Sequence, residues 1–262
     1  MSNIFAEQTS KISKAWSGFK KLREANAMSQ HFSNYLTPVV ANTPELKNTG
    51  YNIRHTVYCD ELKFEPPREN RLEIDEFDCY SVHCLLAHVQ SDTFAGTVRM
   101  VRPKRDNQPL PIEKYCLDSI TNKELSPVNF KRTDICEISR LAVPAIFRRR
   151  RTDKHSGAAL GVINTETYSE QELRCFPFIA VGLYLTAAAV ALQSNIQHAY
   201  VMMEPRLAQS MRFIGIKFEK LGPTIEYHGQ RAPFYINQPL LYKNLTPGFK
   251  VMLNNIQAQL GE

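Results

Sequence analysis

The stretch CEISRLAV, residues 136–143, places ionisable side chains inside an otherwise apolar strand. Glu137, Ser139 and Arg140 interrupt its run of apolar residues. A buried charge is strongly destabilising unless it is paired or solvated, so this strand requires either a cavity or partners of opposite charge. Four charged residues at the boundaries of predicted elements or within predicted strands can supply such partners: Arg54, Asp75, Asp78 and Arg99. We therefore expect these charges to form one cluster around a cleft.

The alternation of side chains along a strand adds a geometric requirement. In a regular strand Glu137 and Arg140 would point to opposite faces of the sheet. A β-bulge between them would bring both side chains to the same face, and bulges are frequent beside active sites. A shared cleft therefore requires an irregularity in this strand.

The composition is that of an ordinary folded protein with an excess of basic residues. Of the 262 residues, 43% are hydrophobic and 22% are charged, which suits one principal domain. The net charge of +6 and the pI near 9.0 favour an acidic partner, such as an acidic carrier protein, an anionic membrane or a nucleic acid. The six cysteines include no CxxC pair, and residues 1–30 lack the apolar core of a secretory signal. We expect a cytoplasmic protein with reduced thiols.

Residues 175–197 carry no charge over 23 positions, a length that could span a bilayer. The alanine content of the segment, its polar tail from Gln193 to Gln197 and the strand-like sequence that follows favour a buried helix instead. We therefore expect no stable membrane insertion.

Strands alternate with helices along the chain. Residues 1–32 are predicted to form an N-terminal helical extension of a main domain, residues 33–262. Thr43 and Pro44 suit the start of a helix that Gly50 would delay or kink. Further strands are predicted at 32–41, 81–90, 93–103, 136–144, 198–203 and within 217–236, and further helices at 175–197, 204–215 and 247–260. This order predicts an α/β domain with a mixed β-sheet flanked by helices.

The order and spacing of the polar motifs carry a family resemblance over roughly residues 40–237. The motifs are Arg54-x-x-x-Tyr58, Phe64, Asp75-Glu-Phe-Asp78, Gly96-x-x-Arg99 and Glu137-x-Ser139-Arg140. Together they resemble the signature of the acyl-homoserine-lactone (LuxI-type) autoinducer synthases. In its longer N-terminus and extended middle loop the chain is similar to two related groups, the N-acyl amino acid synthases and the acyltransferases associated with the PEP-CTERM/exosortase system. It resembles the last group most.

This resemblance implies a GNAT-like fold, that of the acyl-CoA N-acyltransferases. It also implies transfer of a fatty acyl group from a thioester to the amine of a small acceptor such as an amino acid, with no permanently bound cofactor. Carried over by position, the residues that would line the acceptor site or shape it electrostatically are Arg54, Tyr58, Phe64, Asp75, Asp78 and Arg99. Glu137 would be the general base, and Arg140 would hold the charged cluster together.

Two departures from the family pattern bear on the substrates. Family members that use S-adenosylmethionine carry tryptophan where this chain has Phe64, so we do not expect that acceptor. Acetyl-CoA-dependent GNAT enzymes carry a glycine-rich pyrophosphate loop after the central strand, and residues 146–161 show no such pattern. We therefore expect acyl carrier protein, rather than free acyl-CoA, as the donor.

The chemistry of amide formation suggests a role for each polar group of the strand. An amine must lose a proton as it attacks a thioester, and Glu137 can accept that proton directly or through a water. The oxyanion needs preorganised donors, for which we expect the backbone N–H groups from Leu141 to Val143, where the strand should separate from its neighbour. Ser139 could protonate the leaving thiolate, or could satisfy a local backbone group as strand hydroxyls commonly do.

Two further groups of residues invite a functional interpretation. The run Arg148, Arg149, Arg150 and Arg151 is a candidate docking surface for an acidic carrier protein, and the alternative is a solvated loop. No helix-turn-helix, zinc or aromatic RNA-binding pattern accompanies it, so nucleic acid is not expected. Asp75 and Asp78, even with the nearby histidine and cysteines, lack the ligand spacing of a zinc site, and we expect no metal.

Two other functions stay open from the sequence. One is a non-catalytic GNAT-like module that binds lipid or acyl carrier protein. The other is an acetyl-CoA-dependent GNAT acetyltransferase.

Overall fold

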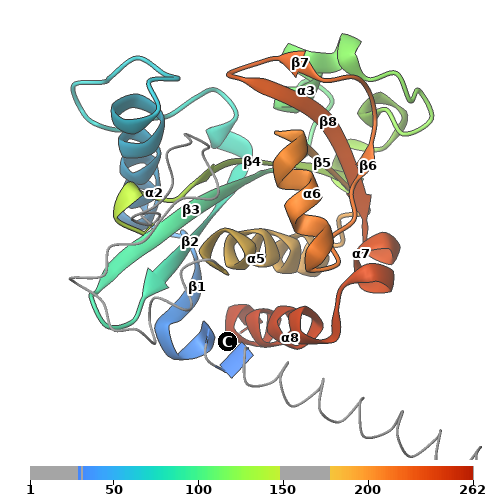
Figure 1. Cartoon of the computed structure of the whole chain (residues 1–262). Coiled ribbons are helices and arrows are strands. Elements are labelled where there is room, and N and C mark those ends of the chain that lie inside the picture. The colour runs from blue at the N-terminus through green and yellow to red at the C-terminus, as the bar shows by residue number, and fades with distance from the viewer. Residues whose placement is uncertain (1–28, 31, 148–177, 262) are drawn as a thin grey trace, which may run out of the picture.

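A computed structural model of the chain describes residues 29–30, 32–147 and 178–261 (Figure 1). These residues form a sheet of eight strands in the order β1-β2-β3-β4-β5-β8-β6, with β7 paired to β8. The strands are β1 (Leu36–Val40), β2 (Ser81–His88), β3 (Thr93–Val101), β4 (Ile135–Ala142), β5 (His198–Met203), β6 (Glu219–Lys220), β7 (Ile225–Glu226) and β8 (Gln230–Asn237). The pair β4 and β5 is parallel, and the other pairs among these strands are antiparallel.

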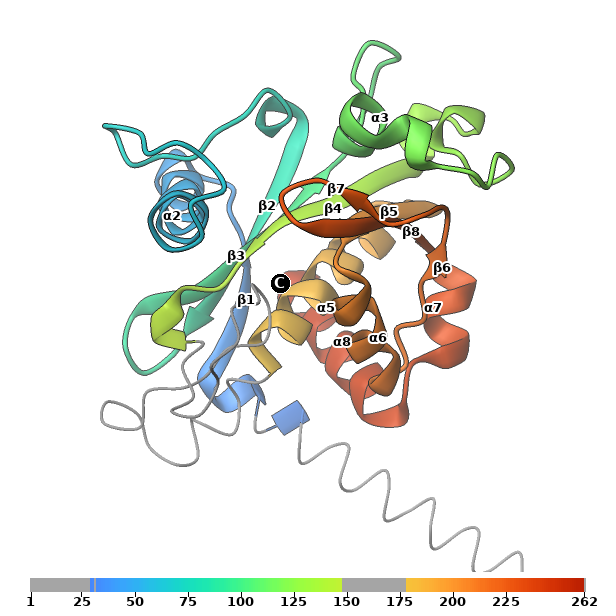
Figure 2. The same ribbon diagram turned by 45° about the horizontal axis from the view of Figure 1, so that its top comes forward.

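Helices cover both faces of this sheet (Figures 1 and 2). On one face, α2 (Pro44–His55) packs against β2, β3 and β4. On the other face, α5 (Ile179–Gln193) packs against β1 to β4 and against α8 (Pro247–Gly261). The shorter helices are α3 (Pro111–Cys116), α6 (Pro205–Phe213) and α7 (Gln238–Asn244).

Local sequence explains where α2 begins and why it runs close to the sheet. Thr43 Oγ1 accepts the backbone N–H of Leu46 at 3.3 Å, and Pro44 occupies the first helical position, where a missing N–H does no harm. The expected delay or kink at Gly50 was wrong, because the helix continues through it to His55. A Cβ at Gly50 would lie 3.3 Å from Thr97 Oγ1 of β3, so the glycine permits close packing instead. A π-helical segment (Thr56–Glu61) prolongs α2.

The uncharged segment forms α5, which is apolar on all sides because it lies between the sheet and α8. Leu183 and Leu185 have no exposed surface, and most other residues of α5 are buried. Among the residues that the structure describes, no helix is both long and apolar enough to cross a membrane.

The start of the main domain differs from the predicted boundary between extension and strand. Residues 32–35 are helical, and β1 begins at Leu36. Phe32 is buried against α5, since a Cβ at Gly182 would lie 2.5 Å from its ring. Phe32, the last residue of the predicted extension, therefore belongs to the core. Residues 1–28 lie outside the described residues, so the helical extension stays a prediction.

The two central strands part from each other partway along the sheet. The parallel register joins β4 residues Ile135 to Glu137 with β5 residues His198 to Tyr200. The register between the two strands extends no further, and beyond Glu137 a gap opens between them.

The irregularity that a shared cleft requires is present in β4. Arg99 of β3 pairs with Ser139, whereas Thr97 pairs with Ala142, so three steps along β4 match two steps along β3. Arg140 lies in this bulge with a φ of 50°, a conformation that L-residues adopt at a cost in energy. Because of the bulge, side chains after it point to the opposite face from the one they would have in a regular strand, so Arg140 can share a face with Glu137.

Gly96 of β3 provides a test of how closely α5 and β4 pack. A Cβ at this position would lie 2.8 Å from the carbonyl oxygen of Ala142 and 2.9 Å from Cδ1 of Leu183. We expect Gly96→Ala to lower the free energy of unfolding by about 1–3 kcal/mol, measured by urea denaturation. In the control Gly261→Ala, at the end of α8, a new Cβ would find its nearest neighbour at 3.9 Å, and we expect a change of less than about 0.5 kcal/mol. Equal stabilities of the two variants would contradict the close packing.

Candidate functional site

A polar cavity of about 470 Å³, including open solvent at its mouth, lies on the α2 face of the sheet beside the gap between β4 and β5. Six residues predicted from the sequence line it: Tyr58, Phe64, Arg99, Glu137, Ser139 and Arg140. The other lining residues are Glu65, Pro111, Met202, Tyr227, His228 and Arg231. The cavity therefore joins the segment after α2, the sheet, the start of α3 and the β7–β8 hairpin.

Next to this cavity lies a group of paired charges that we call the ion cluster. Its members are Arg54, Arg99, Arg140, Glu73, Asp75 and Asp78. Equal numbers of positive and negative side chains allow the cluster to be buried, because each charge has a partner within hydrogen-bonding or ion-pairing distance. The expected cluster of charges is thus present, and two of its members, Arg99 and Arg140, line the cavity.

Arg54, in the last turn of α2, is enclosed by two carboxylates. Its Nη1 and Nη2 donate to the two oxygens of Asp78 at 2.7 and 3.1 Å, and its Nε donates to Glu73. Burial alone would raise the pKa of Asp78, but the hydrogen bonds and charge of Arg54 outweigh burial and hold that pKa well below its usual range. Arg54 does not line the cavity, contrary to its predicted place in the acceptor site, and instead ties α2 to the segment that carries Asp78.

Arg99 connects the ion cluster to the central strand. Its Nη1 donates to Asp75 and, at 2.9 Å, to Asp78, while its Nε donates to Ser139 Oγ at 3.1 Å. Asp78 also accepts the backbone N–H of Asp75 at 2.7 Å. Asp75 and Asp78 therefore shape the wall of the cavity from behind, and the hydroxyl of Ser139 is held by Arg99.

The bulge turns Arg140 into the same cavity as Glu137. Its Nη2 lies 3.1 Å from Glu65, 3.3 Å from Glu73 and 3.4 Å from Asp75. Burial alone would lower the pKa of Arg140, but these carboxylates outweigh burial and hold the pKa well above its usual value. Arg140 thus joins the loop carrying Glu65 and Glu73 to β4, as its predicted role in holding the cluster together requires.

Tyr58 closes the cavity beside Arg140. Its hydroxyl donates to the carbonyl oxygen of Leu141 at 2.7 Å, and the Arg140 Cζ lies 5.5 Å from the centre of its ring. Burial raises the pKa of Tyr58, so the phenol stays protonated near neutral pH. The side chains of Leu141 and Val143 pack with the apolar core under α5, so these positions can offer the cavity only backbone groups.

Glu137 differs from every member of the ion cluster in its environment. Its Oε2 accepts the backbone N–H of Ile112, at the start of α3, at 2.7 Å. Among the described residues no basic side chain lies within 4.0 Å of its carboxylate. Burial raises the pKa of Glu137 to about 8, against the opposing effects of the Ile112 N–H and the charge of Arg99. Glu137 is therefore a carboxyl group that changes its charge near neutral pH, inside a cavity.

Several residues of the site were not singled out from the sequence. Glu73 has no exposed surface and bridges Arg54 and Arg140. Its position two residues before Asp75 was the available signal, since alternate residues of an extended segment share a side. The backbone N–H of Ile112 and the hairpin residues of the cavity carry no local sequence signal.

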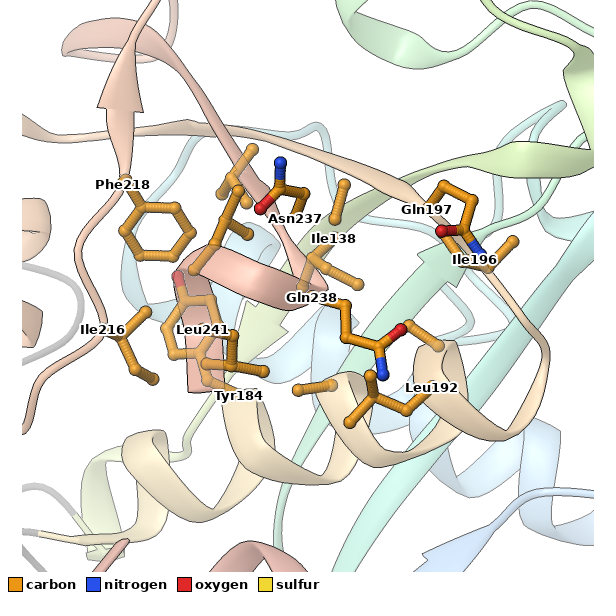
Figure 3. A pocket seen from close by; sticks show the side chains of 15 residues that line it. Ile138, Tyr184, Leu192, Ile196, Gln197, Ile216, Phe218, Asn237, Gln238 and Leu241 are labelled. Atoms are coloured by element: carbon orange, nitrogen blue, oxygen red, sulfur yellow. The ribbon is translucent and has the colours of Figure 1, made fainter. Parts of the chain in front are cut away.

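A second, apolar pocket of about 590 Å³, counted to its mouth, lies on the α5 side of the sheet (Figure 3). Its walls come from the sheet, with Ile138 and Val201, and from α5, with Tyr184 and Leu192. In Figure 3, Tyr184 and Phe218 lie toward one end, and Gln197 lies at the other. Because Ile138 follows Glu137 along β4, the polar cavity and the apolar pocket meet at the same point of the sheet, on opposite faces.

The described residues do not test two predictions, namely the docking surface for a carrier protein and the lack of a bound metal. Arg148 to Arg151, predicted to dock a carrier protein, lie outside the described residues. The carboxylates of Asp75 and Asp78 are bound to arginines, and within residues 29–30, 32–147 and 178–261 no group of three or more His, Cys, Asp or Glu side chains is arranged to hold a metal ion.

Comparison with known proteins identifies the fold. Residues 53–156 match the family model of the acetyltransferase (GNAT) domain. No curated protein matches the sequence. The AHL synthase LasI is structurally similar, with a TM-score of 0.54 at 15% identity over 81% of this chain and 97% of that chain.

Two more solved structures show the same likeness. FeeM, an N-acyl amino acid synthase from uncultured soil microbes, gives a TM-score of 0.54 at 15% identity over 80% of this chain and 94% of that chain. The structure of BjaI, a CoA-dependent acyl-homoserine lactone synthase, with SAM and isopentyl-CoA gives a TM-score of 0.52 at 16% identity, over 85% of this chain and 89% of that chain. The predicted GNAT-like fold is therefore confirmed, and the domain match together with the fold supports an acyltransferase.

The buried pairing of Arg54 predicts a large loss of stability when one partner is removed. We expect Arg54→Met to lower the free energy of unfolding by about 3–5 kcal/mol, because the buried cluster would keep three carboxylates but only two arginines, and Glu73 and Asp78 would lose their hydrogen bonds to Arg54. The matched control is Arg71→Met, whose exposed ion pair with Asp60 spans 2.7 Å and should contribute less than about 1 kcal/mol. Urea denaturation of both variants at pH 7 measures the difference. A loss for Arg54→Met no larger than that of the control would contradict the account of the ion cluster.

The raised pKa of Glu137 predicts a dependence of stability on pH. Between the ordinary pKa of a glutamate and about 8, the unfolded chain releases this proton while the folded protein retains it, so the wild type loses stability as the pH rises. Glu137→Gln keeps an acceptor for Ile112 but cannot ionise. We expect its free energy of unfolding, relative to the wild type, to increase by up to about 1.4 kcal/mol per pH unit between pH 5.5 and 8. A difference that stays constant over this range would exclude the raised pKa.

Proposed function

We propose that this protein is an N-acyltransferase that moves a fatty acyl group from an acyl carrier protein thioester, or from acyl-CoA, to the amine of a small acceptor. One observation carries the proposal. Glu137, whose pKa burial raises to about 8, lines a polar cavity at the point where β4 and β5 separate. A carboxylate with this pKa can take a proton from the acceptor's amino group near neutral pH as its nitrogen attacks the thioester, as a general base must.

The gap between the strands gives the acyl thioester a place that borders both cavities. Ile138 and Val201 line the apolar pocket, and their neighbours Glu137 and Met202 line the polar cavity. A thioester inserted in this gap would direct its hydrocarbon chain into the apolar pocket and its carbonyl carbon toward the acceptor. Each buried methylene would stabilise the complex by roughly 0.8 kcal/mol, which favours fatty acyl groups over acetyl.

The proposed reaction is a direct transfer without a covalent enzyme intermediate. The acceptor nitrogen forms a bond to the carbonyl carbon while Glu137 takes one of its protons, and the C–S bond then breaks. The products are an amide and a free thiol. Ser139, held by Arg99, is the proposed donor of a proton to the leaving thiolate, and its hydroxyl regains a proton from protonated Glu137, directly or through a water. For the oxyanion we propose the backbone N–H groups from Leu141 to Val143, since the pairing of β4 with β5 ends at Glu137 and this part of β4 has no partner on that side.

The acceptor would lie against Tyr58 and Phe64, which line the polar cavity. The ion cluster, with Arg54, Asp75 and Asp78 behind this wall, would fix its shape. The family resemblance implied that these five residues line or shape the acceptor site, and the proposal applies that role at the positions they occupy in the structure.

For the donor we propose acyl carrier protein, with the basic run from Arg148 to Arg151 as its docking surface, because carrier proteins are acidic and this chain carries a net charge of +6. Acyl-CoA is the alternative, since the similar structure of BjaI is that of a CoA-dependent enzyme. The extended middle loop and N-terminus favour a place among the acyltransferases of the PEP-CTERM/exosortase system. The free cysteines among the described residues agree with a cytoplasmic site of action.

The decisive experiment follows release of carrier thiol when purified protein is mixed with acyl carrier thioesters of different chain length and a pool of amines. We expect Glu137→Gln to lower kcat/KM by about 10²- to 10⁴-fold, and the control Glu124→Gln, an exposed residue outside both pockets, to leave it unchanged. Because a protonated carboxyl cannot act as base, the wild-type rate should rise with pH and level off above about 8.

Three results would point elsewhere. A wild type that is silent with every thioester and amine, yet captures acyl carrier protein or lipid, would favour the non-catalytic module. Turnover with acetyl-CoA but with no longer thioester would favour an acetyltransferase. Full activity in Glu137→Gln would exclude Glu137 as the base.

A further inference from the structure

The β7–β8 hairpin carries a cation that borders the polar cavity without a carboxylate partner. Arg231, the second residue of β8, is half-buried in the cavity wall. Its Nε donates to the carbonyl oxygen of His228 at 3.4 Å, a long contact within its own hairpin. Within the described part of the chain, no Asp or Glu oxygen lies within 4.0 Å of its guanidinium.

The other two arginines of the cavity wall, by contrast, have carboxylate partners. Arg99 and Arg140 both belong to the ion cluster, where carboxylates neutralise them. The nearby acidic side chains have other partners. Glu65 pairs with Arg140, and Glu226 accepts hydrogen bonds from the backbone N–H of Gly229 at 3.0 Å and from the side chain of Gln230 at 2.6 Å. Arg231 is therefore the arginine of this wall whose charge is left for a ligand.

The hairpin that presents Arg231 is fixed against both sides of the cavity mouth. Tyr227 stacks on Tyr115 of α3 with ring centres 5.9 Å apart, and His228 lies 5.9 Å from Phe64 in the loop after α2. Residues 227–229 form the three-residue connection between β7 and β8, and its last two residues, His228 and Gly229, have positive φ, 49° and 94°. In Figures 1 and 2 the tip of the hairpin extends from the C-terminal half of the sheet toward the α2 side.

We propose that Arg231 binds a carboxylate of the acceptor and is therefore the residue that distinguishes an amino acid from a simple amine. The cavity offers a base, Glu137, for an ammonium group and a separate guanidinium for an anion, which is the complement of a zwitterion. A guanidinium can bind both oxygens of a carboxylate through parallel hydrogen bonds, which would orient the amine toward Glu137. The proposal rests on the proposed N-acyl transfer and adds the residue that selects its acceptor.

Matched acceptors that differ in the carboxylate alone test the proposal. The pairs are leucine with 3-methylbutylamine, phenylalanine with 2-phenylethylamine, and alanine with ethylamine. In Arg231→Met we expect KM for the preferred amino acid to rise about 10- to 100-fold, because a charge-assisted pair is lost, while KM for the matching amine changes less than about threefold. For Arg231→Lys we expect a KM for the amino acid between those of the wild type and Arg231→Met. The control is Arg212→Met, which changes an exposed arginine of α6 outside both pockets and should leave KM at the wild-type value.

Other outcomes of the same experiment would overturn the proposal. If Arg231→Met raises KM for the acyl donor with every acceptor, Arg231 binds a phosphate of the donor instead. If the wild type uses each amine as well as its amino acid, or if Arg231→Met changes no KM, the cavity does not recognise a carboxylate.

A binding measurement separates this inference from the proposed function. Calorimetric titration of the full-length protein with the twenty amino acids requires no turnover. Binding of at least one amino acid, weakened about 10- to 100-fold in Arg231→Met but not in Arg212→Met, supports the carboxylate site even if no acyl transfer is found. Absence of amino-acid binding in the wild type, or equal binding in Arg231→Met, overturns it even if acyl transfer to other amines is established.

Discussion

The pairing of three arginines with three carboxylates next to the central strands is the interaction on which the rest of this structure depends. Arg54, Arg99 and Arg140 come from α2, β3 and β4, while Glu73, Asp75 and Asp78 come from one irregular segment between α2 and β2. The ion cluster therefore ties this segment, which ends in a short 3₁₀ helix (Asp78–Tyr80), to a helix and two strands. Because the charges neutralise one another, a polar cavity can exist beside a large apolar core.

Glu137 lies beside the ion cluster but does not pair with it, and this separation gives the site its chemical character. Neighbouring arginines hold the pKa of Asp78 well below the usual range despite burial, whereas burial raises the pKa of Glu137 to about 8. Environments that move two carboxyl pKa values in opposite directions are typical of catalytic sites, where one group is structural and the other exchanges a proton. The bulge contributes to this arrangement, because it directs Arg140 into the cluster while Glu137 accepts the N–H of Ile112.

The sequence predicted those features that follow from side-chain period and charge. The mixed α/β sheet, the buried uncharged helix and the convergence of Arg99 and Asp78 follow from such rules. The bulge after Glu137 was only a condition for a shared cleft, because no local signal in the sequence predicts it. Gly50 was misjudged because close packing of α2 on β3 overrides the weak helix propensity of glycine. Contacts that join segments distant in the chain, such as Ile112 with Glu137 and the β7–β8 hairpin with Phe64, have no local signature in the sequence.

The central claim is that a buried, unpaired carboxyl group at position 137 titrates near neutral pH in the folded protein. Carbon-13 NMR of protein labelled at the glutamate side-chain carboxyl carbon measures this directly, with Glu137→Gln identifying the resonance by its absence. The account predicts a resonance that titrates with an apparent pKa near 8, well separated from those of exposed glutamates. A Glu137 resonance that titrates near the ordinary glutamate value would show that the carboxyl group is solvated or paired, and would contradict the account.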